Sequence, residues 1–487
     1  MFRKLTYVFI ILFGSLSSVY AQNSQVLYYM NLPQNHLLNP ALRPSNSFYL
    51  GIPALTGLSV NLNNNFVNLS DILITGQTDS ILTFLHPDYN IEDFISKLKD
   101  KNFLATDIGI QLLGLGFSAG QNLYFFIDII DRVEGNLILP GDLLKLGLKG
   151  NEDYVGSTID LNSLNANLKY YREYSLGFSG NFGSRLRLGM KAKLLTGIAA
   201  LNVQNNSLGL TVNDDFTHSI DADLSANISF PATFQFDEDN MIEDVELDEN
   251  TLESVGFFTN TSNMGLGLDL GAVYNISEKF NVSVSITDLG YIKWKDNITN
   301  FQAKSNFLFS GFDITDVIDG TITFDSLLTN MKDSLLNSFT FSDNKTPFTT
   351  FLPTGITVGA SYNLTRSFGF GLLSRSIISS GHFRQALTLS ANLNLGNSLS
   401  TSLNYTVMNT RYDNFGAGLA FRAGFFQLYL VADRIPVTWN KILPEEGSGI
   451  PIPANWNTAT FRFGINFCFG NRVKTKDDKP MLSDQNQ

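Results

Sequence analysis

Few groups of residues in this 487-residue sequence have the types and the spacing that catalysis requires. The stretch GFSAG, residues 116–120, matches the pattern of a serine nucleophile, which needs a strand, a sharp turn and a helix around the serine. Here QNLYFFIDII follows and alternates like another strand, so we interpret the region of Ser118 as a hairpin turn. The sequence provides no base for this serine, because its four histidines are scattered: His36, His86, His218 and His382. We therefore expect no enzyme.

Metal and cofactor chemistry has as little support. The single cysteine, Cys468, excludes an intramolecular disulfide and a cysteine-based zinc cluster. Residues 236–253, FDEDNMIEDVELDENTLE, hold nine carboxylates and no cation, which suggests a calcium loop. The run lacks the glycine and the terminal bidentate glutamate of an EF-hand, so we favour a solvated surface loop, ion-bridged to lipopolysaccharide. No metal ligand and no cofactor is expected.

Cations fall at regular intervals in RLRLGMKAKLL, residues 185–195. A strand sends successive side chains to opposite faces, so the cations line one face and an aliphatic stripe lines the other. Because a cation facing lipid costs about 2–4 kcal/mol near the membrane midplane, we expect these side chains inside a barrel. There they attract an anionic solute or, as is more common, pair with Asp269 and Asp433. The predicted lumen cations are Arg185, Arg187, Lys191, Lys193, Arg375, Arg384, Arg422 and Arg462.

The elements that position these cations are strands, because the same alternation recurs along the chain. It is clear in MGLGLDLGAVY (264–274), QALTLSANLNL (385–395) and FRFGINFCF (461–469). Several strands are joined by short polar turns and others by long connections, the asymmetry of outer-membrane barrels. The long connections are residues 67–105, 231–262, 311–352 and 435–457. We predict an all-β fold, a transmembrane antiparallel β-barrel of about 14 strands between residues 54 and 469.

Composition supports the barrel over a secreted β-sandwich or adhesin, which also alternates. Charged residues make up 16% of the chain and hydrophobic residues 44%, whereas a sandwich would carry more Lys and Glu on its outer face. The net charge of −12 argues against nucleic acid as a partner. Residues 1–21 have the basic start, apolar run and small-residue end of a signal peptide. These features predict a protein of the outer membrane of a Gram-negative bacterium, in contact with lipid and lipopolysaccharide.

The segment after the signal peptide, residues 22–53, contains a stretch, residues 31–44, that has neither helical nor strand periodicity. Its core is NLPQNHLLNPALRP, in which Asn39 can cap a turn, Pro40 stiffens the backbone and Ala41 allows a close approach to the wall. A barrel of this size is too wide for its own side chains to fill, so we predict a hatch that lodges in the bore. The alternative is a linker into the first strand. A polar tail, residues 470–487, follows the last strand, and amphipathic helices are expected at 90–102 and 323–339.

Three stretches carry a resemblance to a known family: NLPQNHLLNPALRPSNSFYLGIPALTGLSVNL, SITDLGYIKWK and FRFGINFCFG. Across nearly all of the mature chain the sequence resembles a family of Bacteroidota outer-membrane barrels with no assigned activity. Asn39-Pro40-Ala41 also resembles the hatch tripeptide of the long-chain fatty acid transporter family, and Asp288 with Trp294 is similar to a strand element there. The attachment barrel of type IX secretion looks like a further relative of that superfamily.

The resemblance implies passage or capture of a small hydrophobic or amphiphilic ligand, with the hatch and a lateral strand irregularity as the route. The alternative function is a non-transporting scaffold or secretion-system accessory barrel that binds a periplasmic or secreted protein partner.

Overall fold

The computed structural model describes the chain from residue 25 to residue 470 with several gaps. The described residues are 25–53, 55–68, 70, 73–75, 81–83, 91–215, 217–236, 242–309, 340–379, 382–408, 411–436, 438–442, 450–453 and 457–470. The predicted signal peptide, the predicted helix 323–339 and all but the first residue of the predicted tail lie outside them. Among the described residues, no helix is both long and apolar enough to cross a membrane. Across the same ranges, no three His, Cys, Asp or Glu side chains gather as a metal site.

Fourteen antiparallel strands form a closed barrel, which confirms the predicted fold class and strand number. The barrel closes because β26 pairs with β23 along one edge and with β1 and β2 along the other. In order around the wall the strands are β1 (Phe48–Gly51) with β2 (Gly57–Asn64), β5 (Lys101–Ala119), β6 (Leu123–Pro140), β8 (Asn165–Phe182), β9 (Leu186–Val212), β13 (Met264–Asn275), β14 (Phe280–Trp294), β17 (Phe348–Phe351) with β18 (Thr354–Asn363), β19 (Phe368–Ser379), β20 (His382–Leu395), β21 (Leu399–Met408), β22 (Arg411–Ala423), β23 (Phe426–Ile435) and β26 (Thr458–Phe469).

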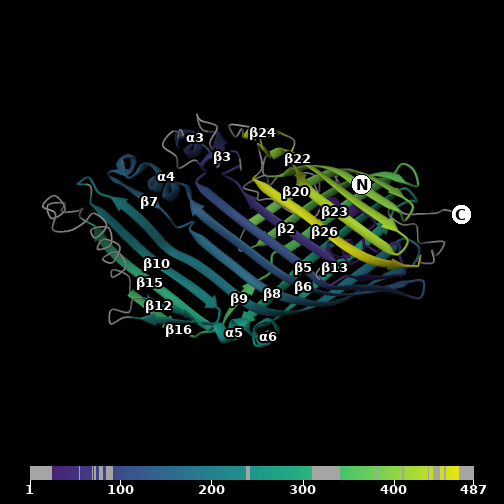
Figure 1. Cartoon of the computed structure of the whole chain (residues 1–487), viewed down its shortest axis with the longest axis horizontal. Helices are drawn as coiled ribbons and strands as arrows, with labels where there is room; N and C mark the ends of the chain where they lie inside the picture. Colours follow the sequence, from purple (N-terminus) through teal and green to yellow (C-terminus); the bar gives the residue numbers. More distant parts are fainter. Residues whose placement is uncertain are drawn as a thin grey trace, which may run out of the picture.

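Short turns connect the strands at one end of the barrel, on the right in Figure 1, and long connections lie at the other end. The turn between β5 and β6 spans residues 120–122, so Ser118 lies on a strand that a second strand follows, not at a nucleophile elbow. The long connections hold short elements: β3 (Leu73–Thr75), β4 (Ile81–Thr83), α3 (Ile91–Ile95), α4 (Gly141–Lys149), η3 (Glu152–Tyr154), β7 (Ser157–Asp160), β24 (Trp439–Ile442) and β25 (Ile450–Pro453).

The strand β9 divides the molecule into a barrel and a sheet beyond it. A tilted strand crosses a membrane with about 9–11 residues, whereas β9 has 27. The first part of β9 pairs with β13, and this pairing stops where Met264, the first residue of β13, lies opposite Thr196. The last part of β9, from Ala200 to Val212, pairs with β10. We call the sheet beyond this point the extension. It consists of the last part of β9, β7, β10 (His218–Ser229), β15 (Ile298–Phe309) and β16 (Thr340–Asn344).

The acidic run, residues 236–253, lies in the connection between β10 and β13. Strands β11 (Ala232–Phe236) and β12 (Ile242–Leu247) pair, and two short helices follow, α5 (Glu249–Glu253) and α6 (Val255–Thr259). Asp248 caps α5, and the side-chain and backbone hydrogen bonds from Thr251 lower the pKa of its carboxyl. The side chains described between residues 245 and 250 are exposed, as expected of a solvated loop.

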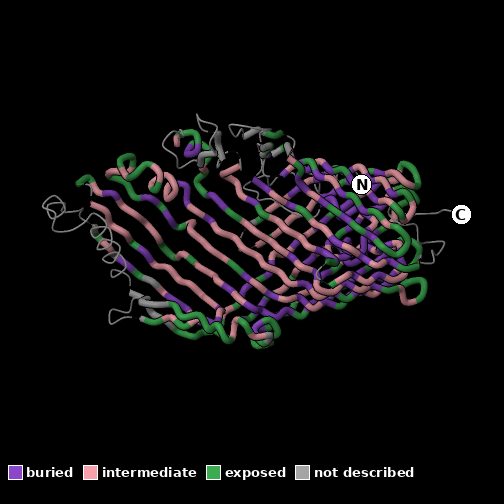
Figure 2. Tube along the Cα trace, in the orientation of Figure 1, coloured by how far each residue is buried: buried purple, intermediate pink, exposed green. Residues whose placement is uncertain are grey.

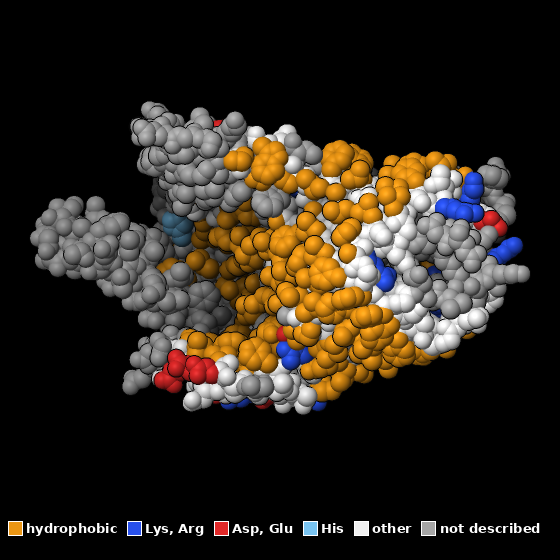
Figure 3. All heavy atoms as spheres, turned by 45° about the vertical axis from the view of Figure 1, so that its right-hand side comes forward, with side chains coloured by type: hydrophobic (Ala, Val, Ile, Leu, Met, Phe, Trp, Pro, Cys, Tyr) orange, Lys and Arg blue, Asp and Glu red, His pale blue; other side chains and the backbone are white. Residues whose placement is uncertain are grey.

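Side chains alternate between the lumen and the outer surface along each wall strand. On β9, Lys191 and Lys193 are buried, whereas Leu188, Met190 and Leu194 between and beside them are 37–41% exposed. Figure 2 shows this alternation along the strands, and Figure 3 shows hydrophobic side chains over the middle of the outer surface. The outer face is therefore apolar although the strands carry polar groups on their other face.

Tyr171 and Trp294 face the lumen and are fully buried, although Trp294 is the last residue of β14. Two local expectations were wrong. The helix predicted for residues 90–102 ends at Ile95, because β5 begins at Lys101 and draws the chain into the wall. The wall itself starts at Phe48, before residue 54, since β1 and β2 are one strand interrupted around Pro53.

Candidate functional site in the bore

The segment before the first strand, residues 25–47, lies inside the barrel at its short-turn end; we call it the N-terminal segment. Two 3-10 turns, η1 (Val26–Tyr29) and η2 (Pro33–Leu37), give it its shape, because Pro33 starts η2 with a fixed φ. Its apolar side chains form one core cluster with inward residues of β13, β19, β22 and β23. Each large side chain buried in this way contributes about 1.5–3 kcal/mol. The buried members from the segment are Val26, Leu27, Tyr28, Tyr29, Met30, Leu32, Leu38, Ala41 and Leu42.

Hydrogen bonds tie the N-terminal segment to strands on all sides of the wall. Val26 donates its backbone N–H to the Asp433 carboxylate at 2.8 Å, and this carboxylate had been expected to pair with a lumen cation. Further bonds link Tyr28 with Ser283, Tyr29 with the Ala360 and Leu372 carbonyls, Asn31 with Ser400, Gln34 with Asn466, and Arg43 with Ser179. The segment therefore contacts the wall on several sides of the bore at this level.

A buried histidine connects the segment with a buried carboxylate of the wall. The Nε2 atom of His36 lies 2.8 Å from the Asp128 carboxylate on β6, and its Nδ1 atom lies 2.5 Å from the Pro33 carbonyl oxygen. Both partners are acceptors, so an imidazole with one proton satisfies only one of them and the imidazolium satisfies both. Asp128 also accepts from Gln111 at 2.8 Å, and the ring of His36 stacks on Phe126. These contacts hold η2 against the wall.

Asn39, Pro40 and Ala41 form a tight elbow in the segment. The Asn39 side-chain oxygen accepts the Ala41 N–H at 2.9 Å, which closes a turn across Pro40. Ser285 donates to the Leu38 carbonyl at 2.7 Å and Ser179 to the Ala41 carbonyl at 3.2 Å, so two wall hydroxyls hold the carbonyls on either side of the elbow.

The elbow touches the wall where two glycines face each other. Gly189 on β9 and Gly271 on β13 are directly paired. A Cβ atom at Gly189 would lie 2.2 Å from the Pro40 carbonyl group, and one at Gly271 would lie 2.1 Å from the side-chain oxygen of Asn39. Such distances leave no room for a side chain, so the elbow rests on bare strand backbone. We call this place the glycine window.

On the outer surface, a groove of about 430 Å³ lies over the same two glycines. The wall between the groove and the elbow is one strand backbone thick, since Gly189 and Gly271 line the groove from outside and contact the elbow from inside. The other lining residues are almost all apolar and come from β8, β9, β13 and β14: Phe178, Phe182, Leu188, Met190, Leu270, Ala272, Val284, Ser285 and Ile286.

The strand pairing is irregular next to the window. The register between β13 and β14 shifts between Leu268 and Leu270, and Asp288 on β14 has a φ of 59°, in the left-handed region. A bulge of this kind leaves one residue out of the ladder and weakens the local pairing. The Asp288 N–H instead donates to the Asp269 carboxylate at 2.6 Å.

A cluster of buried charges stands in the lumen beside this bulge. Lys191 lies 3.2 Å from Glu173 and 3.3 Å from Asp269. Lys193 lies 3.0 Å from Asp269 and also contacts Asp288 and Glu173. With Arg132, 3.3 Å from Glu173, the cluster has three cations and three anions. The cluster is therefore balanced, which favours the pairing interpretation of these lysines over attraction of an anionic solute.

The other predicted lumen cations are dispersed. Arg375 donates to Thr357 at 3.3 Å, and Arg462 lines a cavity of about 40 Å³ with Asp107 and Arg132. Arg187 bonds Asn181 near the short turns; Arg384 is on the inward-facing side of β20; Arg422 bonds the Gly424 and Cys468 carbonyls at that end. Arg185 does not lie in the lumen: it is exposed in the turn before β9, because the alternation starts only at Leu186.

Sequence reasoning missed the partners that complete these contacts. Glu173 sits at an inward position of the alternating stretch KYYREYSLGF, so the strand pattern could have placed it opposite the lysines. Asp128 interrupts the apolar run LYFFIDII at an inward position in the same way. No local signal pairs Gly189 with Gly271, since their register is set by the whole sheet.

Among solved structures, a Pseudomonas aeruginosa FadL homologue aligns with 93% of this chain and 100% of its own, at 10% identity and a TM-score of 0.41. The Ralstonia pickettii toluene transporter TbuX aligns with 90% of this chain and 94% of its own, at 10% identity and a TM-score of 0.36. The Pseudomonas putida toluene transporter TodX aligns with 92% and 98%, at 9% identity and a TM-score of 0.37. Curated protein sequences give no match.

A family model matches residues 40–433, most of the chain and most of the wall. The match begins at Pro40 of the elbow and includes both glycines of the window and all members of the charge cluster. The chain therefore belongs to the "Family of unknown function (DUF5723)".

Proposed function

We propose that the protein is an outer-membrane barrel that passes or captures a small hydrophobic or amphiphilic ligand, with the N-terminal segment as its hatch. The observation that carries this proposal is the glycine window. Gly189 and Gly271 line the apolar groove on the outside of the wall and contact the elbow on the inside. Among the described residues, they are the only directly paired wall glycines that contact the N-terminal segment. A ligand in the groove is separated from the lumen by strand backbone and by the elbow.

The outer face supports a position in a membrane. Large apolar side chains, among them Leu266, Leu389 and Leu403, are more than half exposed on the middle of the wall strands. A folded protein in water rarely leaves so continuous an apolar surface, visible in Figure 3, uncovered. The buried ion pairs of the charge cluster lie on the opposite face, where lipid does not reach them.

We infer that the elbow is the part of the segment that moves when a ligand passes. Its carbonyls are held by the hydroxyls of Ser179 and Ser285, and such hydrogen bonds contribute about 0.5–1.5 kcal/mol each. The stretch from Val26 to Leu32 buries several large apolar side chains and is held more strongly. Movement of the elbow away from the wall, next to the bulge at Asp288, would open a lateral path between lumen and groove.

The Gly189→Ala/Gly271→Ala variant tests this route. Two added methyl groups would collide with backbone and side-chain atoms of the elbow and displace it from the wall. In cells that carry the protein in their outer membrane, uptake of the fluorescent hydrophobic probe N-phenylnaphthylamine is expected to rise severalfold over wild type. The matched control is Gly209→Ala on the same strand, where a Cβ would lie 3.6 Å from Thr158, an ordinary contact.

Equal uptake by the double variant, the control and cells without the protein would contradict the transporter proposal. That result would favour the non-transporting scaffold, for which the position of the elbow has no effect on hydrophobic solutes. A variant whose uptake falls below wild type would also contradict it, because displacement would then close the route.

A further inference from the structure

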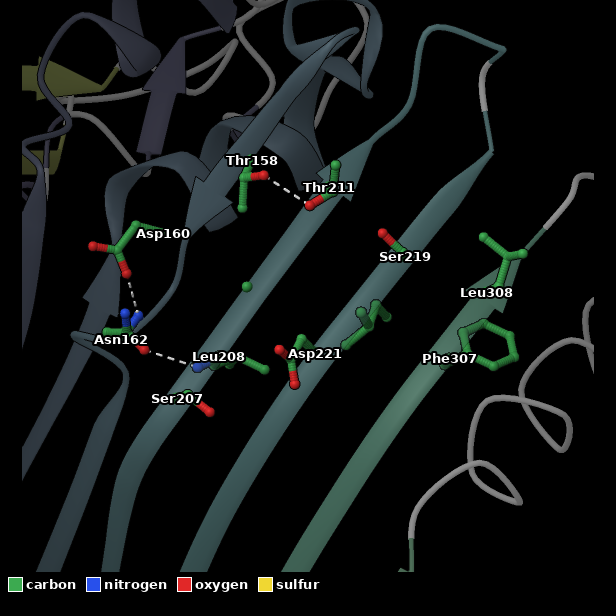
Figure 4. Close-up of a pocket in the computed structure, with 12 residues that line it drawn as sticks. Thr158, Asp160, Asn162, Ser207, Leu208, Thr211, Ser219, Asp221, Phe307 and Leu308 are labelled. Atoms are coloured by element: carbon green, nitrogen blue, oxygen red, sulfur yellow. Dashed lines mark hydrogen bonds between the residues drawn. The ribbon is translucent and has the colours of Figure 1, made fainter.

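A hollow of about 530 Å³ lies in the extension, above the barrel wall and far along the strands from the glycine window. Its face continues the inner face of the barrel. Ala200 on β9 belongs to a buried cluster that faces the lumen, and it pairs with Ser229 on β10. Side chains alternate along a strand, so every second residue of β10 counted from Ser229, including Asp221 and Ser219, lies on the lumenal face. Figure 4 shows the hollow across β7, β9, β10 and β15.

Two carboxylates flank a glycine floor in this hollow. Gly209 on β9 is paired directly with Asp160 on β7 and with Asp221 on β10. Because Gly209 has no side chain, the space between the two aspartates stays open. Hydroxyl groups surround it on the neighbouring positions of the same strands: Thr158, Thr211, Ser207 and Ser219.

Several of these groups have no partner within the described part of the chain. The Ser207, Ser219 and Asp221 side chains make no hydrogen bond or ion pair there, while Thr158 and Thr211 bond each other at 2.8 Å. Asp223, two residues along β10, is different: it is bonded by Gln302 and Asn206. Ser207, Ser219 and Asp221 are therefore available to a ligand, and Asp160 has one carboxylate oxygen that accepts from Asn162 at 2.9 Å and a second oxygen for a ligand, whereas Asp223 is already bonded.

The lining selects one class of ligand. It contains no Lys, Arg or His, so phosphate, sulfate and carboxylate groups would meet only negative charge. Two carboxylates without a third ligand do not form a metal site. Carboxylates and hydroxyls side by side suit the vicinal hydroxyl groups of a sugar. Leu308 pairs with Ser219 and so lies on the same face of the sheet, where its apolar side chain can cover the C–H face of the sugar.

We propose that this hollow binds a neutral carbohydrate, with Asp160 and Asp221 as the hydrogen-bond acceptors on either side of a sugar ring that rests on Gly209. The volume lies within the range of small-molecule sites, about 300–1,000 Å³. The site is separate from the proposed hydrophobic route, and its test does not depend on that route.

Binding of neutral trisaccharides of glucose, mannose, galactose and xylose to the purified protein tests the proposal. Saturation-transfer NMR and calorimetry are done in a zwitterionic detergent, because maltoside detergents would compete. At least one trisaccharide is expected to bind, and Asp221→Asn and Gly209→Leu should each weaken it about tenfold or more, a loss of about 1.4 kcal/mol. Asp223→Asn is the matched control and should leave binding unchanged.

Absence of binding by all four trisaccharides would overturn the proposal. Binding that survives Gly209→Leu would overturn it as well, since that side chain fills the floor. A sulfated trisaccharide of the same sugar that binds equally well would contradict the assignment to neutral ligands.

Discussion

A Glu173→Gln variant is expected to lose about 3–5 kcal/mol of folding stability, because removal of one partner from a buried ion pair leaves the other charge uncompensated. Glu173 is fully buried and contacts Lys191, Lys193 and Arg132. Without its charge the cluster would hold three cations and two anions in a lumen closed below by the N-terminal segment. The variant should unfold at a clearly lower temperature in detergent, measured by the change in gel mobility that heating causes in such barrels.

Two companion variants separate charge balance from packing. Glu173→Gln/Lys191→Met restores equal numbers of cations and anions and should recover much of the loss. Asp223→Asn removes a carboxylate from a more exposed pair with Lys304, 3.7 Å apart, and should change stability by no more than about 1 kcal/mol. A Glu173→Gln protein as stable as wild type would show that the cluster is not held together by charge.

The second large effect is expected at the contact between His36 and Asp128. An Asp128→Asn variant keeps the shape of the side chain but removes the carboxylate that faces Nε2 of the His36 ring. Both residues are buried, so polar atoms that lose a good hydrogen-bond partner there cannot be compensated by bulk water. We expect η2 to loosen, with amide hydrogen exchange at residues 35–38 at least about tenfold faster, which corresponds to about 1.4 kcal/mol.

The wall should stay intact in that variant, and exchange in β6 and β26 should remain slow. The His36→Gln/Asp128→Asn variant, in which two amide side chains can form a hydrogen bond in place of the original contact, should restore part of the protection. Unchanged exchange at residues 35–38 in Asp128→Asn would mean that apolar burial alone holds the segment.

The strands were predictable because the period of two is a local signal. Each alternating stretch, such as residues 264–274, carries its inner and outer faces in its own order of residues, and the turns between strands carry Gly, Asn and Ser. The lumen positions of Lys191 and Lys193 followed from the same pattern. The elbow was also visible in the sequence, since Asn39, Pro40 and Ala41 have turn chemistry whatever surrounds them.

Contacts between distant strands were not predictable in this way. That Gly189 meets Gly271, or that Asp128 meets His36, depends on register and on how deep the N-terminal segment lies in the bore. The division of β9 between β13 and β10 was equally hidden, because a strand of 27 residues alternates in the same manner on both sides of the division point. Burial of Tyr171 and Trp294 depends on the same long-range geometry.

The measurement that tests the account most directly is the conductance of the purified barrel in a planar lipid bilayer, with and without residues 23–45. The complete chain should be silent, because the N-terminal segment fills the bore, and the shortened chain should form stable open channels. Its mobility shift on heating should match that of the complete chain, which shows that the wall has folded. A shortened, folded barrel that remains silent, or a complete chain that conducts equally well, would contradict the idea that this segment closes the bore.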